Sequence, residues 1–265
     1  MNDLAIFIIS CDKYSDIWNP FFEMFFKYWD DCPYTIYLCT DSLIYDHPKI
    51  ITLAPGIGRN WSEILKYGLE RCPHQYVLLL QEDYIVYKRV YNNVINHYLN
   101  IAQQAQAACV KLVPHPAPDA VYPNNKDVGF ISKGREYRVS TQAAIWNKEA
   151  LLSLIDVREN PWEFEHKASI RSNQTNYLFL SINKLSDLFS VTYPYHYYIT
   201  SVVGGKWKRI AVRICKKNRV KVDLDKRPME GFWNMIYYDY APGTVKHVMD
   251  FVGHRFLKKK YWGYN

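Results

Sequence analysis

The sequence lacks any run of about 18 or more apolar residues, the length that a bilayer-spanning helix requires. It also lacks a C-x-x-C pair, because its six cysteines are dispersed at positions 11, 32, 39, 72, 109 and 215. The opening Met1-Asn2-Asp3 carries none of the positive charge that begins a secretory signal peptide. We therefore expect a cytoplasmic protein whose cysteines are free thiols.

Signatures of nucleic-acid binding are absent as well, although the formal net charge is +7. No zinc-finger spacing or RNA-binding motif accompanies the basic residues, so nucleic acid is not an expected partner. Part of the positive charge sits late in the chain, at Lys206, Lys208, Arg209, Arg213, Lys216, Lys217, Arg219, Arg255, Lys258, Lys259 and Lys260. Two interpretations of this basic tail remain open. It lies against an anionic membrane surface, where each Lys or Arg contributes about 1 kcal/mol, or it is a solvated helical face.

The first third of the chain alternates between short apolar runs and amphipathic segments. Apolar runs at 4–10, 34–39, 50–53 and 76–81 predict buried strands, and the segments 18–29 and from 61 onward predict helices. Asn60 followed by Glu63 matches the capping box that begins a helix. This order predicts an α/β fold with a mostly parallel sheet flanked by helices.

The later segments are less regular. We expect a helix over 90–107, an apolar strand over 109–113, a strand over 139–146, and a helix capped by Asn147 that runs to about 155. A further helix, up to about Lys184, either carries the acids of the segment 159–165 or follows them. Neither an internal repeat nor a low-complexity linker occurs, and a boundary near Gly204-Gly205 divides a domain over 1–205 from a basic, aromatic extension over 206–265.

The apolar run Tyr76 to Leu80 ends in two adjacent acids, Glu82 and Asp83. In an open α/β sheet, ligands bind beyond the carboxyl ends of the strands. Two carboxylates at that place can hold a divalent cation, and the cation can hold a diphosphate. The alternative is that the two acids only open a solvated loop.

Several such segments follow one another in a familiar order: Ser10-Cys11-Asp12, Thr40-Asp41, Asn60-Trp61 to Glu82-Asp83-Tyr84, and Ser140-Thr141-Gln142 through Trp162-Glu163-Phe164-Glu165, with weaker support from Gly204-Gly205-Lys206-Trp207. Together they resemble a glycosyltransferase of the GT-A type, of the kind that builds bacterial lipopolysaccharide or capsule. The resemblance covers roughly residues 4 to 207 and rests on order and spacing rather than on any one motif.

The resemblance implies a donor site for a nucleotide-sugar. Ser10 and Asp12 would line the base and ribose pocket, and Asp41 would accept hydrogen bonds from base or ribose; the alternative for Asp41 is a turn residue. Arg59 would pair with phosphate at the start of a helix, or else face solvent. Further donor contacts would come from Glu82, Gln142 and Lys206.

The same resemblance places Glu82 and Asp83 at the family's Asp-x-Asp metal motif, with Asp83 as the preferred ligand of Mg²⁺ or Mn²⁺. The motif here reads Gln81-Glu82-Asp83, and this departure puts metal dependence in question. Some GT-A enzymes use a late histidine as a third ligand, a role that would fall to His196. The alternative is a packed, hydrogen-bonded histidine.

The second acidic cluster, Glu163 and Glu165, would supply the general base of an inverting transfer, with Glu165 favoured. In an extended segment both acids point to one side, whereas in a helix they diverge by about 200°. Trp162 would stack on an acceptor sugar and desolvate the carboxylate. The alternative is that Trp162 and Phe164 anchor a core turn while the acids face water.

Three functions therefore compete. The leading one is a glycosyltransferase, inverting, that moves a sugar from a nucleotide-diphosphate sugar, UDP-linked by preference, to a surface glycan that is lipid-linked at the inner face of the cytoplasmic membrane. A nucleotidyltransferase is the second, weakened because no Gly-rich basic loop follows the first strand. The third is a non-catalytic protein that binds carbohydrate or a membrane surface and needs neither acidic cluster.

Overall fold

The computed structural model describes residues 3–183, 194–197 and 200–231. The chain divides into two compact units, Met1–Ile199 and Thr200–Asn265. The expected boundary at Gly204-Gly205 falls within the second unit, at the turn between the paired strands β10 (Val202–Val203) and β11 (Lys206–Trp207). Both glycines have positive φ, 55° and 74°, as a tight hairpin turn demands.

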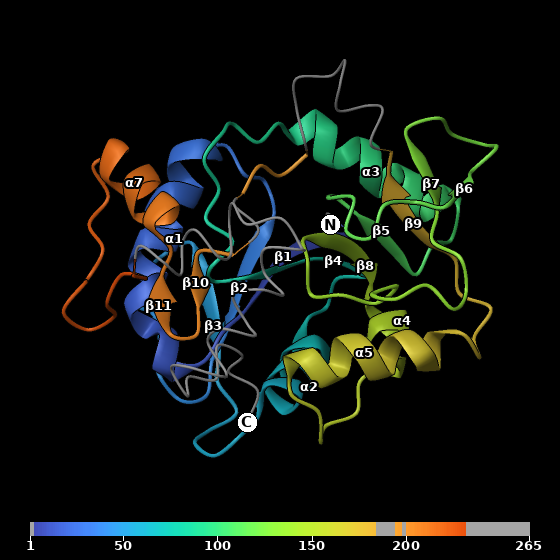
Figure 1. Ribbon diagram of the computed structural model, residues 1–265. Coiled ribbons are helices and arrows are strands. Elements are labelled where there is room, and N and C mark those ends of the chain that lie inside the picture. Colours follow the sequence, from blue (N-terminus) through green and yellow to red (C-terminus); the bar gives the residue numbers. More distant parts are fainter. Residues whose placement is uncertain (1–2, 184–193, 198–199, 232–265) are drawn as a thin grey trace, which may run out of the picture. The chain divides into compact units, whose positions relative to one another are not determined.

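In the described part of the first unit, nine strands form one sheet in the order β3-β2-β1-β4-β8-β5-β9-β7-β6 (Figure 1). The predicted α/β class is confirmed. The parallel part consists of β3, β2, β1 and β4, and beyond β4 antiparallel pairs predominate, with β5 and β9 parallel. The strands span Leu4–Ile9 (β1), Thr35–Cys39 (β2), Ile50–Leu53 (β3), Tyr76–Gln81 (β4), Cys109–Lys111 (β5), Ala120–Val121 (β6), Val128–Phe130 (β7), Ala144–Asn147 (β8) and Phe179–Ile182 (β9).

Helices cover both faces of this sheet because its central strands are apolar on both sides. In β1, Leu4, Ile6 and Ile8 pack on one face, against α1 (Ser15–Tyr28) and α3 (Asn92–Gln104). Ala5, Phe7 and Ile9 pack on the other, against α2 (Trp61–Arg71), α4 (Lys148–Ser153) and α5 (Pro161–Ser172). Figure 1 shows α3 on one side of the sheet and α2, α4 and α5 on the other. The period-two alternation of β1 thus sets two cores.

Asparagine caps fix where the helices of the second face begin. The Asn60 side chain accepts from the Glu63 N–H and the Glu63 carboxylate accepts from the Asn60 N–H, so the predicted capping box is confirmed. Asn147 caps α4, also as predicted. A second capping box, Asn160 with Glu163, starts α5 at Pro161. The helix therefore carries both Glu163 and Glu165, which answers the question that the sequence left open.

Two predicted elements differ from the structure. The helix expected up to about residue 184 ends at Ser172, because the apolar segment Phe179–Ile182 joins the sheet as the buried strand β9. The strand expected over 139–146 begins only at Ala144, because the N–H groups of Val139 and Thr141 bond to α5 instead of to a neighbouring strand.

The second unit contains the hairpin β10-β11 and the helix α7 (Arg209–Lys217), whose first N–H donates to the Glu230 carboxylate at 2.9 Å. Arg213, Lys216 and Lys217 are exposed on α7. Within the described ranges of the whole chain, no helix combines the length and the apolar character needed to cross a membrane.

Substituting Gly68 by Ala tests how tightly α2 packs on the sheet. A Cβ at this position would lie 2.5 Å from Cys39 Sγ and 2.7 Å from Phe7 Cζ, both in the buried core. Overpacking costs about 1–3 kcal/mol, which outweighs the gain of up to about 1 kcal/mol in helix propensity. We expect Gly68→Ala to lower the melting temperature, whereas Glu70→Ala on the exposed face of α2 leaves it nearly unchanged. An unchanged or higher melting temperature for Gly68→Ala would contradict the packing described.

Candidate functional site

The carboxyl ends of β1, β2 and β4 bring acidic residues together. Ile9 lies opposite both Cys39 and Gln81 in the parallel register, so the residues that follow these three strands are neighbours. Burial, and then the charges of Glu82 and Asp41, raise the pKa of the Cys11 thiol to about 11. The thiol therefore stays protonated between two carboxylates, one from the loop after each flanking strand.

Asp12 holds the loop that follows β2. Its carboxylate accepts hydrogen bonds from the Ser42 N–H at 3.1 Å, the Ser42 hydroxyl at 2.6 Å and the Leu43 N–H at 3.0 Å. Desolvation alone would raise the pKa of Asp12, but these hydrogen bonds outweigh it and hold the pKa below its usual value. Asp12 is thus an anionic anchor that fixes the backbone immediately after Asp41.

Asp41 presents an unsatisfied oxygen. Its Oδ1 is buried and has no hydrogen-bond partner in the described part of the chain. Burial, and then the charge of Asp12, raise the pKa of Asp41. A buried acceptor without a donor is costly unless a ligand supplies one. The hydroxyl of Ser10, by contrast, already accepts from the Trp18 indole at 2.7 Å and is buried.

A second group of candidate residues lies where the segment 139–141 runs along α5. The Val139 N–H donates to Ser169 Oγ at 3.0 Å, and Thr141 donates to Glu165 Oε1 from its N–H at 2.7 Å and its hydroxyl at 2.9 Å. Two extended residues span roughly 6.6 Å and four helical residues roughly 6 Å, so positions 139 and 141 match 169 and 165 on the helix. No hydrogen bond within the described residues reaches Glu165 Oε2.

Glu163 is turned to another side of the same helix. Its carboxylate accepts from the Asn160 N–H at 3.1 Å and pairs with Lys167 Nζ at 3.1 Å. The hydrogen bond from Asn160, and then that from Lys167, hold the pKa of Glu163 below its usual value. Both of its interactions stabilise the first turns of α5, so the structure separates Glu163 from Glu165.

A buried polar network connects Tyr84, which follows the acids at the end of β4, with Thr141, which holds Glu165. Gln142 donates to Tyr84 OH at 3.1 Å and accepts from Tyr197 OH at 2.7 Å, and the two tyrosine rings stack with centroids 4.6 Å apart. Tyr84 OH also lies 3.4 Å from Thr141 Oγ1. Burial raises the pKa of both phenols, and the nearby charges of Asp83 and Glu165 raise it further. Asp83 and Glu165 therefore act electrostatically on the same pair of rings.

The remaining predicted donor and acceptor residues lie at the margin or elsewhere. Arg59 is half-exposed and pairs with Glu63 at 3.1 Å. Trp162 is 65% exposed on the first turn of α5, on the same helix as Glu165. Lys206 is an exposed residue of β11 in the second unit.

His196 lies in a short extended stretch. Tyr197 forms an isolated antiparallel bridge with Val86, and the Tyr87 N–H donates to the His196 carbonyl at 3.0 Å. Because side chains alternate along extended backbone, His196 faces away from its neighbour Tyr197 and toward the ring of Tyr87. Burial, and then the charge of Lys88, lower the pKa of His196 to about 4.

Glu82 and Asp83 are the residues that fit a divalent cation. Both are only 7% exposed, and they follow the central strand β4. Within the described residues no group of three or more His, Cys, Asp or Glu side chains gathers for a metal ion. Mg²⁺ is commonly bound by only one or two carboxylates together with waters and substrate phosphates, so a two-carboxylate site suits a cation that arrives with a diphosphate.

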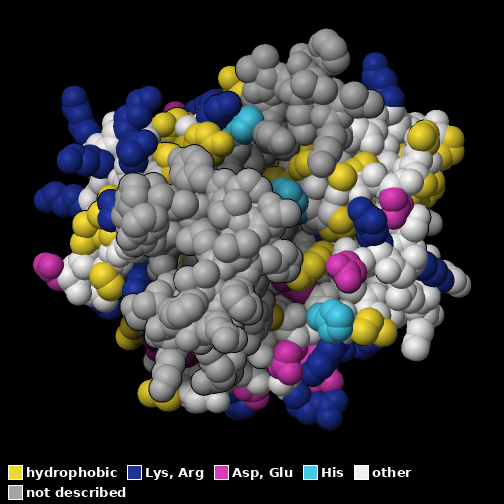
Figure 2. Space-filling model, viewed as in Figure 1, with side chains coloured by type: hydrophobic (Ala, Val, Ile, Leu, Met, Phe, Trp, Pro, Cys, Tyr) yellow, Lys and Arg dark blue, Asp and Glu magenta, His cyan; other side chains and the backbone are white. Residues whose placement is uncertain are grey.

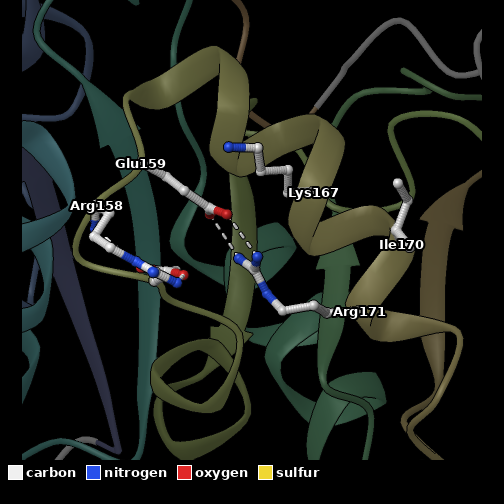
Figure 3. Close-up of a pocket in the computed structure, with 6 residues that line it drawn as sticks. Arg158, Glu159, Lys167, Ile170 and Arg171 are labelled. Atoms are coloured by element: carbon white, nitrogen blue, oxygen red, sulfur yellow. Dashed lines mark hydrogen bonds and ion pairs between the residues drawn. The ribbon is translucent and has the colours of Figure 1, made fainter.

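A cavity of about 550 Å³ lies on a different face of α5 (Figure 3). Arg171 forms a two-pronged ion pair there with the buried Glu159, at 2.6 and 2.7 Å, and Lys167 and Ile170 extend from the helix. Figure 2 shows acidic, basic and apolar side chains intermingled on the lower right of the visible surface. Glu165 is absent from the cavity lining, so this cavity is not continuous with the described site.

The sequence reasoning did not assign roles to Thr141, Tyr84, Tyr197 or Lys111. Lys111 had a local signal, since a lysine interrupts the otherwise apolar run 109–113. The structure buries this lysine completely. Tyr197 and Thr141 had none, because their partners Gln142 and Glu165 are distant in sequence.

No protein-family model and no curated protein matches the sequence. Among solved structures, a protein described as a nucleotide-diphospho-sugar transferase from Desulfovibrio desulfuricans G20 is similar at a TM-score of 0.43 with 10% identity, covering 83% of this chain and 96% of that one. TarS 1–349 from S. aureus gives 0.41 with 10% identity, covering 94% and 79%. The galactosyltransferase LgtC gives 0.40 with 11% identity, covering 64% and 70%. Because each TM-score lies below 0.5, none of these likenesses assigns a function to this chain.

Removing the Tyr197 hydroxyl tests the buried network. Tyr197→Phe leaves the Gln142 carbonyl and the Ala143 N–H without their partner. Each buried group left unsatisfied costs about 1–3 kcal/mol, so we expect a clear loss of stability in urea unfolding. Tyr195→Phe is the matched control, because its hydroxyl makes only a long bond of 3.4 Å to the Tyr84 carbonyl. Equal losses in the two variants would contradict the network.

Proposed function

We propose that this protein is a glycosyltransferase that moves a sugar from a nucleotide-diphosphate sugar to a glycan acceptor. The observation that carries the proposal is the fixed Glu165 carboxylate. One of its oxygens is held by Thr141, the other receives no hydrogen bond from the described residues, and its charge acts on the same buried tyrosines as that of the strand-end acid Asp83. One site would then bind the donor diphosphate near Asp83 and contain a general base, Glu165.

The donor nucleotide binds at the ends of β1 and β2. Asp41 Oδ1 accepts a hydrogen bond from the base or ribose, which supplies the donor that this buried oxygen lacks. Ser10 and Asp12 line this pocket and fix its wall. Ser10 accepts a hydrogen bond from Trp18, and Asp12 accepts hydrogen bonds from the backbone of residues 42 and 43. Arg59, at the amino end of α2, reaches phosphate when it leaves Glu63.

Glu82 and Asp83 would hold Mg²⁺ or Mn²⁺, with Asp83 as the principal ligand. The cation, when bound, neutralises charge on the departing diphosphate. A cation at this place would also offset the repulsion between two nearly buried carboxylates and a diphosphate.

Glu165 is the general base of an inverting transfer. Its Oε2 takes the proton of the acceptor hydroxyl as that oxygen forms a bond to the anomeric carbon, and the bond from this carbon to the diphosphate oxygen breaks with its electron pair. Thr141 fixes the carboxylate for that step, and Gln142, the next residue, bonds to both tyrosines. Trp162, one turn before Glu165, offers an exposed ring on which the acceptor sugar stacks.

The finer assignments extend the proposal. UDP is the favoured nucleotide, and the acceptor is a bacterial surface glycan of the lipopolysaccharide or capsule kind, lipid-linked at the inner face of the cytoplasmic membrane. The exposed cations Arg213, Lys216 and Lys217 of α7 suit an anionic membrane surface, where each contributes about 1 kcal/mol.

The two glutamates of α5 form a matched pair for testing the base. Glu165→Gln keeps the shape but removes the base, so kcat for sugar transfer should fall about 10²- to 10⁴-fold. Glu163→Gln disturbs only the helix cap and the Lys167 pair, and kcat should stay within about twofold. Both are measured by release of nucleotide diphosphate with donor and acceptor present. Loss of kcat in Glu163→Gln with an active Glu165→Gln would reverse the assignment.

Nucleotide and metal binding are tested by thermal melting with UDP, GDP, CMP, ADP and dTDP, each with EDTA, Mg²⁺ or Mn²⁺. A nucleotide at about 100 times its dissociation constant stabilises the fold by about 2.7 kcal/mol, which is visible as a melting shift. We expect a shift with UDP that needs the metal in the native chain and is reduced by Asp83→Asn and by Asp41→Asn. A shift without metal would remove the metal role of Glu82 and Asp83, and no shift with any nucleotide would favour a non-catalytic glycan-binding protein.

A further inference from the structure

We propose that Lys111 is a positioning residue for Glu165: its ammonium group fixes the segment 137–141, whose last residue holds the carboxylate. The inference rests on the proposed function for its catalytic consequence, whereas its structural content concerns only the residues themselves. Lys111 touches no substrate in this account and acts through Ser140 and Thr141.

The ammonium group of Lys111 is completely buried at the end of β5. It donates to the His115 carbonyl at 3.0 Å, the Tyr137 carbonyl at 2.6 Å and the Ser140 hydroxyl at 2.8 Å. Three hydrogen bonds use the full capacity of an ammonium group. A buried charge is costly unless it is satisfied in this way, so the group joins the loop after β5 to the segment before β8.

This junction leads directly to Glu165. Ser140 precedes Thr141, whose N–H and hydroxyl hold Glu165 Oε1. Two residues further, the Ala143 carbonyl accepts from the Leu112 N–H at 2.9 Å, where the segment enters the sheet. Lys111 thus fixes one end of the short stretch between the sheet and the base, and the sheet fixes the other.

The charges around Lys111 agree with this role. Burial lowers its pKa to about 8, whereas Cys109 on its own strand and the Glu165 charge from α5 act to raise it. Glu165 and Lys111 therefore attract each other through the intervening Ser140 and Thr141.

A second buried cation anchors the same segment elsewhere, so the loss of Lys111 need not unfold it. Arg138 donates to the Ile131 carbonyl, to the Ser172 carbonyl and hydroxyl, and to the Tyr177 carbonyl, and it lies over the Phe179 ring at 4.1 Å. Arg138 ties the segment to the far end of α5. Of these two buried cations, Lys111 is the one that bonds to a residue next to Thr141, namely Ser140.

The test compares Lys111→Met and the milder Ser140→Ala with the native full-length chain. Lys148→Met is the matched control. Lys148 donates to the Cys72 carbonyl at 2.9 Å, and this hydrogen bond involves neither Glu165 nor the segment 137–141. Two readouts are taken: amide hydrogen exchange of Thr141, and kcat and donor KM for sugar transfer. The exchange measurement needs no substrate, so it decides the positioning claim even if the native chain transfers no sugar.

We expect Thr141 exchange to rise at least tenfold in Lys111→Met and less in Ser140→Ala, while β1 and β4 keep their protection and Lys148→Met leaves Thr141 unchanged. With turnover, kcat should fall about 10- to 100-fold at a nearly constant donor KM, since a displacement of about 1 Å costs that much. Unchanged Thr141 exchange, or a rise shared equally by β1 and β4, would overturn the proposal. If Lys111→Met does not fold, the same criteria apply to Ser140→Ala.

Discussion

The pairing of residues 139–141 with α5 is the constraint on which the candidate site depends. The N–H groups of Val139 and Thr141 donate to Ser169 and Glu165, which lie four residues apart on the helix. This match in spacing fixes the Glu165 carboxylate against the segment that leads into the sheet. The same match explains why β8 starts only at Ala144, since Val139 and Thr141 before it are already bonded to the helix. A strand that began earlier would leave Glu165 without its two donors.

The other half of the site follows from the parallel strands. Parallel register places the ends of β1, β2 and β4 side by side, so acids that are far apart in sequence meet without any special loop. Within that edge the acids divide into two kinds. Asp12 accepts hydrogen bonds from the backbone, whereas Asp41 keeps a buried oxygen that has no partner among the described residues. Fixed anchors beside unsatisfied groups are what a ligand site requires, because the anchors prevent the loop from collapsing onto the open group.

Much of the fold could be predicted from the sequence because its signals are local. Apolar runs located β1 to β4, and Asn60 with Glu63 located the start of α2. The orientation of Glu163 and Glu165 was left open, although Asn160 followed by Glu163 is the same capping signature and predicts a helix that carries both acids. The bond from Thr141 to Glu165 could not be predicted, because it joins segments 24 residues apart whose approach depends on the packed sheet.

The central claim is that a nucleotide diphosphate binds at the carboxyl edge of β1, β2 and β4, beside Asp41 and Asp83, and not in the cavity on α5. A crystal structure of the chain with UDP and Mn²⁺ tests it most directly. We predict density for the nucleotide with a base or ribose donor within hydrogen-bond distance of Asp41 Oδ1 and the diphosphate next to Asp83. Nucleotide density beside Arg158 and Arg171, with Asp41 Oδ1 still unpartnered, would contradict the account.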